Sequence, residues 1–330
     1  MRVLVLGGTS FVGRHIDGAA RANGHDVTLL NRGVSPNNSP AEVLIADRDD
    51  PASLTVVDGR SWDVAIDVSG LNAARVLTAS RALRDAVDHY VLISTVSVYD
   101  SAPGSFVTEN SPTVLADADD PSAPDMARYA EQKRAAELAA LRTFGADQVA
   151  VLRPGVILGP FENIGRLSYW LGRAATPGQF IAPGVAGRAF DSVDARDLAE
   201  FAVHLGRQRT SGTFTCLNPP GRDTWGDFIA SACWATGADA EPVWIPDDVL
   251  LDAGVAQWSG LPMWLADEPA VHSTQAATAA GLECRPLSVT LEDSWSWLAG
   301  LDAEPARLYR PAALDRETEA GILAAYAARS

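Results

Sequence analysis

Tyr129 and Lys133 lie four residues apart in the segment ARYAEQKRAAE, residues 127–137. Lys133 is the single lysine among the 26 lysine and arginine residues of the chain. Residues at this spacing share one face of a helix, so a helix here would bring the ammonium group to the phenol. A nearby cation lowers the pKa of a tyrosine from its ordinary value of about 10. The pair therefore predicts a general acid or base; the alternative is a surface lysine paired with Glu137.

Three hydroxyl groups stand at the end of an apolar run in the segment ISTVSVY, residues 93–99. They belong to Ser94, Thr95 and Ser97. Ligands of open parallel sheets bind at the carboxyl ends of the strands. Any one of the three hydroxyls is therefore placed to donate a hydrogen bond to a substrate oxygen.

The segment VLVLGGTSFVGRHI contains Gly7 and Gly13, six residues apart between an expected strand and an expected helix. A glycine at position 7 permits a tight turn, and a glycine at position 13 lets the helix pack closely on the strand. The first N–H groups of such a helix face a pyrophosphate. Ser10 stands where the middle glycine of G-x-x-G-x-x-G is expected, and the position of the motif still predicts a dinucleotide-binding turn.

The second expected strand ends in Asn31-Arg32-Gly33, without the carboxylate that often binds the ribose hydroxyls of NAD. Arg32 is suited to pair with a 2′-phosphate, which favours NADP(H) over NAD(H). The alternatives for Arg32 are stacking on adenine or pointing to solvent. Asp47 is placed either to accept from the adenine amino group or to form a turn.

The first half of the chain alternates Val/Ile/Leu-rich runs with helical patterns, as in a parallel sheet covered on both faces. We expect a Rossmann-type doubly wound α/β fold. The expected strands are 2–7, 26–31, 41–47, 62–70, 89–99, 148–155 and 212–218, and the expected helices are 11–24, 73–87, 125–145, 194–206 and 316–329. We assign residues 1–160 to the dinucleotide-binding domain, with 189–218 returning to it. Residues 161–188 and 219–330, richer in Trp, Pro and Gly, form a smaller irregular lobe for the substrate.

The composition narrows the class of protein. A net charge of −16 over 330 residues disfavours binding to nucleic acid. The sequence contains no apolar run of 18 residues and no signal-peptide pattern, which predicts a cytoplasmic protein that does not contact a membrane. Its three cysteines form no CxxC pair, so neither a disulfide framework nor a metal site is expected.

The motifs together resemble the extended and atypical branches of the short-chain dehydrogenase/reductase superfamily, which include epimerases and dehydratases of nucleotide sugars. The resemblance is clear over residues 1–160, continues through RAFDSVDARDLAEFA at 188–202, and becomes general beyond about residue 220. It implies a catalytic triad of Thr95, Tyr129 and Lys133, assisted by a nicotinamide cofactor. Ala130 departs from the glycine that usually follows the tyrosine.

The resemblance also implies two sets of binding residues and a possible homodimer. We expect the cofactor, NADP or NAD, to be bound by Gly7, Gly8, Thr9, Ser10, Phe11, Val12, Gly13, Asn31, Arg32, Asp47, Arg48, Val68, Ser69, Tyr129, Lys133 and Pro154. We expect the small-molecule substrate, a ketone, an alcohol or a nucleotide sugar, to be bound by Ser97, Gly155, Val156 and Arg188.

The reaction is narrowed by residues that differ from relatives. Family dehydratases carry an acidic pair after the catalytic threonine, where this chain has Val96 and Ser97. An NADPH-dependent ketone reductase or alcohol dehydrogenase is the leading hypothesis, a nucleotide-sugar epimerase is the second, and a cofactor-sensing protein without turnover is the third. Arg188 matches an arginine that contacts sugar-nucleotide phosphates in relatives, or else pairs with a nearby acid such as Asp191 or Asp194. Gly155 stands near the place of a substrate-binding asparagine.

Overall fold

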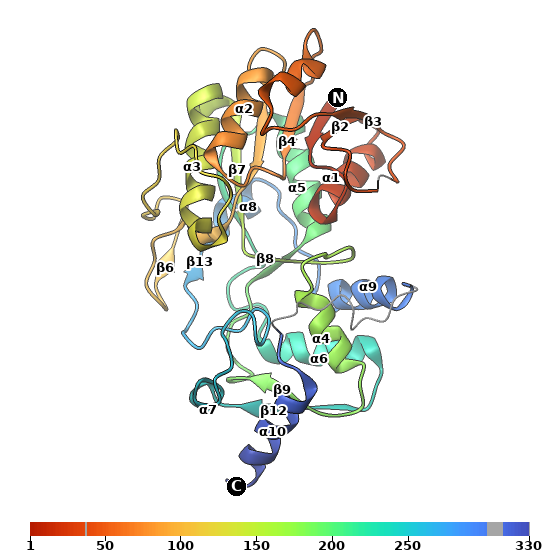
Figure 1. The fold of residues 1–330 in the computed structure, drawn as a ribbon, viewed down its shortest axis with the longest axis vertical. Helices are drawn as coiled ribbons and strands as arrows, with labels where there is room; N and C mark the ends of the chain where they lie inside the picture. Colours follow the sequence, from red (N-terminus) through yellow and green to blue (C-terminus); the bar gives the residue numbers. More distant parts are fainter. Residues whose placement is uncertain (37, 302–312, 330) are drawn as a thin grey trace.

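A seven-stranded parallel sheet forms the centre of the computed structural model, which describes residues 1–36, 38–301 and 313–329 (Figure 1). The strand order is β11-β7-β5-β4-β1-β2-β3. The strands are β1 (Arg2–Leu6), β2 (Asp26–Asn31), β3 (Glu42–Ile45), β4 (Val64–Asp67), β5 (Tyr90–Ile93), β7 (Val149–Pro154) and β11 (Gly212–Cys216). This order confirms the doubly wound sheet expected from the sequence.

Helices cover both faces of the sheet because successive residues of each strand point to opposite sides. Val3 and Val5 of β1 pack in one core with α1 (Phe11–Ala22) and α5 (Ala195–Gln208). Leu4 and Leu6 pack in the opposite core with α2 (Ala73–Leu83) and α3 (Tyr129–Phe144). The strands are therefore buried on both sides, which explains their continuous apolar sequence.

A third core lies below the sheet in Figure 1 and is built from later parts of the chain. Its largest fully buried side chains are Trp170, Trp264, Phe180 and Phe228. Its elements are α4 (Arg166–Ala174), α6 (Trp225–Thr236), α7 (Asp247–Asp252), α9 (Leu287–Ala299), α10 (Arg316–Ala327) and the parallel pair β9 (Gly178–Pro183) and β12 (Ala240–Ile245). Most of its tryptophans therefore serve as core residues.

Two short strand pairs and one short helix complete the fold. The strand β8 (Val156–Leu158) pairs with β10 (Ser192–Asp194), and β6 (Phe106–Val107) pairs with β13 (Val271–His272). The helix α8 (Gln275–Ala279) packs on β11, and its Ala277 lies in the core that α1 and α5 form with one face of the sheet. The assignment of all of 219–330 to the substrate lobe was therefore too broad. Residues 302–312 and 330 of that range lie outside the described residues.

Most expected elements are shorter in the structure than the sequence pattern indicates, and for two of them a capping side chain is the reason. The strand at 89–99 ends at Ile93, because Thr95 caps a short 3₁₀ turn, η2 (Val96–Val98), by accepting from the N–H of Ser97. The helix at 125–145 begins at Tyr129 and is preceded by η3 (Met126–Arg128), which Asp125 caps. Further 3₁₀ turns are η1 (Pro51–Val57) and η4 (Ala146–Gln148). Within the described ranges, no helix is long and apolar enough to cross a membrane.

Candidate active site

A cleft of about 340 Å³ opens at the carboxyl ends of β1, β2 and β4. Most of the residues expected to bind the cofactor line this cleft. They are Gly7, Thr9, Ser10, Phe11, Val12, Gly13, Asn31, Arg32, Asp47, Arg48, Val68 and Ser69. The cleft therefore collects side chains from four separate segments of the sequence.

Four of the residues expected to bind the cofactor do not line the cleft. Gly8 does not line the cleft, because it packs against Leu29, and Tyr129, Lys133 and Pro154 are also absent from its lining. The cleft is completed by residues that the sequence reasoning missed, which follow the expected strand ends or begin the next helix. They are Leu30, Val34, Ser35, Ala46, Leu71 and Arg75.

The turn after β1 has the geometry that a pyrophosphate requires. Gly7 has φ +96°, and a Cβ at Gly13 would lie 2.3 Å from the carbonyl oxygen of Gly7. The first turn of α1 has no acidic residue, and no side chain caps its N–H groups. Ser10 is extended at φ −135°, which explains why this position does not need glycine. The turn therefore fits a dinucleotide, whose pyrophosphate would take hydrogen bonds from α1.

Three arginines line the outer part of the cleft, and two of them have carboxylate partners. Arg48 donates to Asp67 at 2.7 Å and to Ser69 at 2.5 Å, so its guanidinium is held inside the protein. Arg75 pairs with Asp49. Arg32 is exposed. The carboxylate of Asp47 accepts from the N–H of Asp49, which gives Asp47 the role of a turn residue at the edge of the cleft.

Tyr129 is the first residue of α3, and its phenol lies close enough to the Thr95 side chain for Thr95 to act on the pKa of the phenol. The Thr95 hydroxyl also donates to Ser97 at 3.1 Å. Ser94 instead donates to Glu137 at 2.5 Å, on the buried side of the helix. Of the three hydroxyls at the end of β5, that of Thr95 is the one next to the phenol.

The Lys133 amine is buried, with 4% of the residue exposed. It donates to the carbonyl oxygens of Gly70 at 2.9 Å and Ile93 at 2.6 Å. Gly70 lies between Ser69 and Leu71, which both line the cleft, so the amine reaches the edge of this cleft. Lys133 is therefore not the surface lysine of the alternative interpretation.

Lys133 was expected to lower the pKa of the Tyr129 phenol, and this structure does not show a lowered pKa. Burial raises the pKa of Tyr129 above its ordinary value, although Thr95 and the charge of Arg166 act in the opposite direction. Burial also lowers the pKa of Lys133 to about 8. The phenol is therefore protonated at neutral pH, and the prediction of a lowered tyrosine pKa was wrong for this state.

Arg166 is a charged neighbour of Tyr129 that the sequence reasoning missed. It begins α4, and the buried carboxylate of Glu162 accepts from the backbone N–H groups of Ile164, Gly165 and Arg166. Gly165 has φ +86°, which favours glycine at this turn. A residue 37 positions after Tyr129 has no local pattern that would connect it to the phenol.

The residues expected to bind substrate lie in different environments. Gly155 follows β7, where a Cβ would meet Leu217 at 2.4 Å, and Val156 begins β8. The guanidinium of Arg188 pairs with Asp247 and also donates to the carbonyl oxygen of Leu265 at 2.9 Å. Arg188 therefore has an internal partner, although the partner is neither Asp191 nor Asp194.

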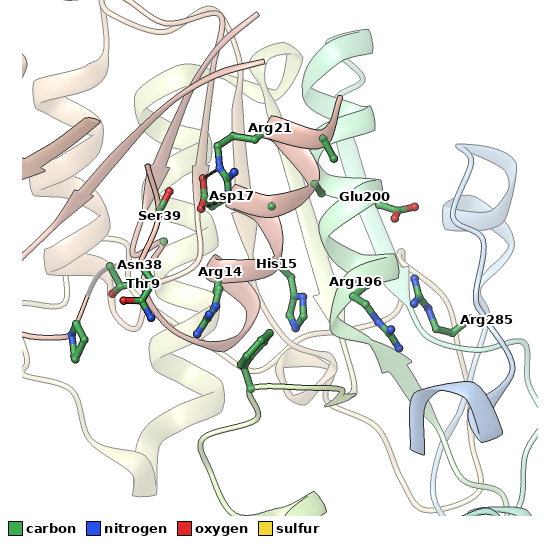
Figure 2. Close-up of a pocket in the computed structure, with 16 residues that line it drawn as sticks. Thr9, Arg14, His15, Asp17, Arg21, Asn38, Ser39, Arg196, Glu200 and Arg285 are labelled. Carbon is green, nitrogen blue, oxygen red and sulfur yellow. Dashed lines mark hydrogen bonds and ion pairs between the residues drawn. The ribbon is translucent and has the colours of Figure 1, made fainter. Parts of the chain in front are cut away.

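A larger cavity of about 460 Å³ lies between α1, α5 and the segment around Asn38. Figure 2 shows Arg14 and His15 from α1 and Arg196 from α5, with Arg285 beside Arg196. Arg196 pairs with Asp194 and Asp293, and Arg285 pairs with Asp197. Of the residues expected to bind the cofactor, only Gly8 and Thr9 line this cavity, so it is not the candidate active site.

Residues 58–215 match the family model described as the NAD dependent epimerase/dehydratase family. The 2′-dehydrokanamycin reductase of Streptomyces kanamyceticus is 27% identical over 256 residues, which cover 74% of this chain and 70% of the relative. The dTDP-6-deoxy-L-talose 4-dehydrogenase (NAD(P)(+)) of Kitasatospora kifunensis is 30% identical over 177 residues, which cover 48% of this chain and 53% of the relative.

A solved structure of the human epimerase family protein SDR39U1 with NADPH shares the fold. The match has a TM-score of 0.63 and 21% identity, and covers 90% of this chain and 99% of the human chain. The fold, the glycine turn and the family match together support an NAD(P)-dependent enzyme. Over residues 58–215, the chain is therefore similar to the NAD dependent epimerase/dehydratase family.

Proposed function

We propose that the protein is an NADP(H)-preferring reductase that converts a ketone to a secondary alcohol. The observations that carry this proposal are that Thr95 lies next to the Tyr129 phenol and that Lys133, four residues along α3, contacts Gly70, which lies between Ser69 and Leu71 of the cleft. A phenol that is protonated at neutral pH suits a general acid for carbonyl reduction.

When bound, the nicotinamide cofactor supplies a hydride from its C4 to the carbonyl carbon. Tyr129 donates its phenolic proton to the carbonyl oxygen as that oxygen gains negative charge. The hydroxyl of Thr95 donates a hydrogen bond to the same oxygen and stabilises the developing charge. The charge of Arg166 already favours the phenolate in this structure, and we propose that the Lys133 ammonium adds to it during the reaction, until a proton from solvent restores the phenol.

Two observations favour a reductase over a nucleotide-sugar epimerase. The Arg188 guanidinium is already paired with Asp247, so its charge is less available to a diphosphate. The two relatives described above are named as a reductase and a dehydrogenase. The epimerase remains the second candidate, because the same three side chains would serve a reaction that returns the hydride to its own intermediate.

A panel of ketones, including oxidised sugars, tests the proposed reaction with purified protein and NADPH. A reductase consumes NADPH and forms alcohol in equal amounts. An epimerase interconverts nucleotide sugars without a net change in NADPH absorbance, which would overturn the proposal. Binding of NADPH without any turnover would support the cofactor-sensing alternative.

Replacing Arg32 by serine should raise the KM for NADPH about tenfold and leave the KM for NADH unchanged. A charge-assisted hydrogen bond to a 2′-phosphate contributes about 1.5–3 kcal/mol, and NADH has no such group. Initial rates with each cofactor measure the effect, and NADH is the internal control. An equal change for both cofactors would show that Arg32 does not recognise the 2′-phosphate.

The pH dependence of reduction should reflect Lys133. The Lys133 pKa of about 8 means that the ammonium is present below that pH and is lost as the pH rises through it. The pKa of Tyr129 is raised above its ordinary value, so the phenol keeps its proton over the same range. We expect kcat/KM for NADPH, which reports the free enzyme, to fall above about pH 8. A profile that stays flat to about pH 10 would contradict a requirement for the ammonium.

A further inference from the structure

Glu137 is a fully buried carboxylate at the centre of a hydrogen-bond network, although no part of the proposed mechanism uses it. It accepts from the Ser94 hydroxyl at 2.5 Å and from two nitrogens of Arg153 at 2.9 and 2.7 Å. Arg134 donates to it at 2.7 Å. Burial acts to raise the pKa of Glu137, but these donors hold it below the ordinary value, so the group is an anion.

The partners of Glu137 lie next to the residues proposed to act on the substrate. Ser94 directly precedes Thr95 at the end of β5, and Arg153 directly precedes Pro154 at the end of β7. Glu137 itself is one helical turn after Lys133 on α3. One side chain therefore joins the helix of the catalytic pair to the ends of two neighbouring strands.

Glu137 is also one of the charges around the Lys133 amine. Asp67 of β4 and Glu137 of α3 act to keep the amine protonated, whereas burial and Arg48 act to remove its proton. From β5, the neutral carbonyl oxygen of Ile93 faces the amine. Asp67 is shared with Arg48 and Tyr90, which donate to the same carboxylate oxygen at 2.7 Å each.

Resting on the proposed reductase function, we propose that Glu137 is a positioning residue for this site. Its carboxylate joins α3 to the ends of β5 and β7 and places a negative charge one helical turn from Lys133. The residue acts through Lys133 and Thr95 and does not touch substrate or cofactor.

The unique lysine allows a direct test that needs no substrate. Protein labelled with ¹³C at the lysine Cε gives one side-chain resonance, whose titration follows Lys133 alone. The wild-type midpoint is expected near pH 8. In Glu137→Gln the midpoint should fall by about one pH unit, because an opposite charge close to the amine has been removed.

Glu131→Gln is the matched control, since it removes the same charge from the first turn of the same helix. Its lysine midpoint should equal that of the wild type. Glu137→Gln leaves the buried Arg153 without its carboxylate and is therefore at risk of unfolding. The double variant Glu137→Gln/Arg153→Gln removes that charge as well and should show a smaller downward displacement of the lysine titration, because a positive charge is lost with the negative one.

Activity provides the second measurement. In folded Glu137→Gln, the pH above which kcat/KM for NADPH falls should be lower than in the wild type, by as much as the Lys133 midpoint is lowered. Activity near pH 6 should change much less. A lysine midpoint that stays at the wild-type value in both folded variants would overturn the proposal. If the midpoint moves but the wild-type protein reduces no ketone, the proposed function fails and the electrostatic role of Glu137 stands.

Discussion

Replacing Tyr129 by phenylalanine should lower kcat for ketone reduction about 10²- to 10⁴-fold, the usual contribution of a positioned general acid. The change removes one oxygen atom and leaves the ring on α3. The affinity for NADPH should change little, because Tyr129 does not line the dinucleotide cleft. Steady-state rates and a fluorescence titration with NADPH separate the two effects.

Tyr326→Phe is the control, since Tyr326 lies on α10 and packs at the border of the third core. It should keep wild-type kcat. If Tyr129→Phe also kept wild-type turnover, Tyr129 would not be the proton donor, and the proposed reaction would need another acid.

Replacing Gly13 by alanine should weaken NADPH binding about 10- to 100-fold and lower the free energy of unfolding by about 1–3 kcal/mol. The new Cβ would lie 2.3 Å from the carbonyl oxygen of Gly7, and backbone cannot move aside as a flexible side chain can. The turn or α1 must shift, which displaces the N–H groups that face the cleft. Isothermal titration with NADPH and urea unfolding measure the two quantities.

Gly18→Ala is a matched control for that variant, because Gly18 lies on the same helix and a Cβ there meets nothing within 4 Å. Alanine inside a helix is favoured over glycine by about 0.5–1 kcal/mol. Gly18→Ala should therefore bind NADPH normally and unfold at a higher urea concentration. Normal NADPH binding by the folded Gly13→Ala protein would show that the turn is not the cofactor site.

The parts of the fold that depend on local patterns could be predicted from the sequence. The apolar run at 26–31 is strand β2 with the same bounds, and the helix expected at 11–24 ends two residues earlier. The glycines at 7 and 13 indicated the turn because their roles follow from backbone geometry at fixed spacing. The end of the strand near residue 93 was missed, because it depends on the conformation of Thr95, whose side chain caps the following turn.

The contacts between distant segments could not be predicted. Arg188 and Asp247 are 59 residues apart, and Arg48 and Asp67 are 19 apart on different elements. Neither pair has a spacing that indicates contact. Burial also depends on distant segments, so the sequence predicted a lowered pKa for Tyr129 where the structure raises it. The sequence shows the neighbouring lysine but not how deeply the phenol is buried.

The burial of the single lysine has a chemical consequence for the whole molecule. Reagents that acylate primary amines find no ε-amino group on the surface while the chain stays folded. Apart from the α-amino terminus, this protein is therefore inert toward them. Acylation of Lys133 therefore requires α3 to separate from the sheet, and its rate would measure how often that local unfolding occurs.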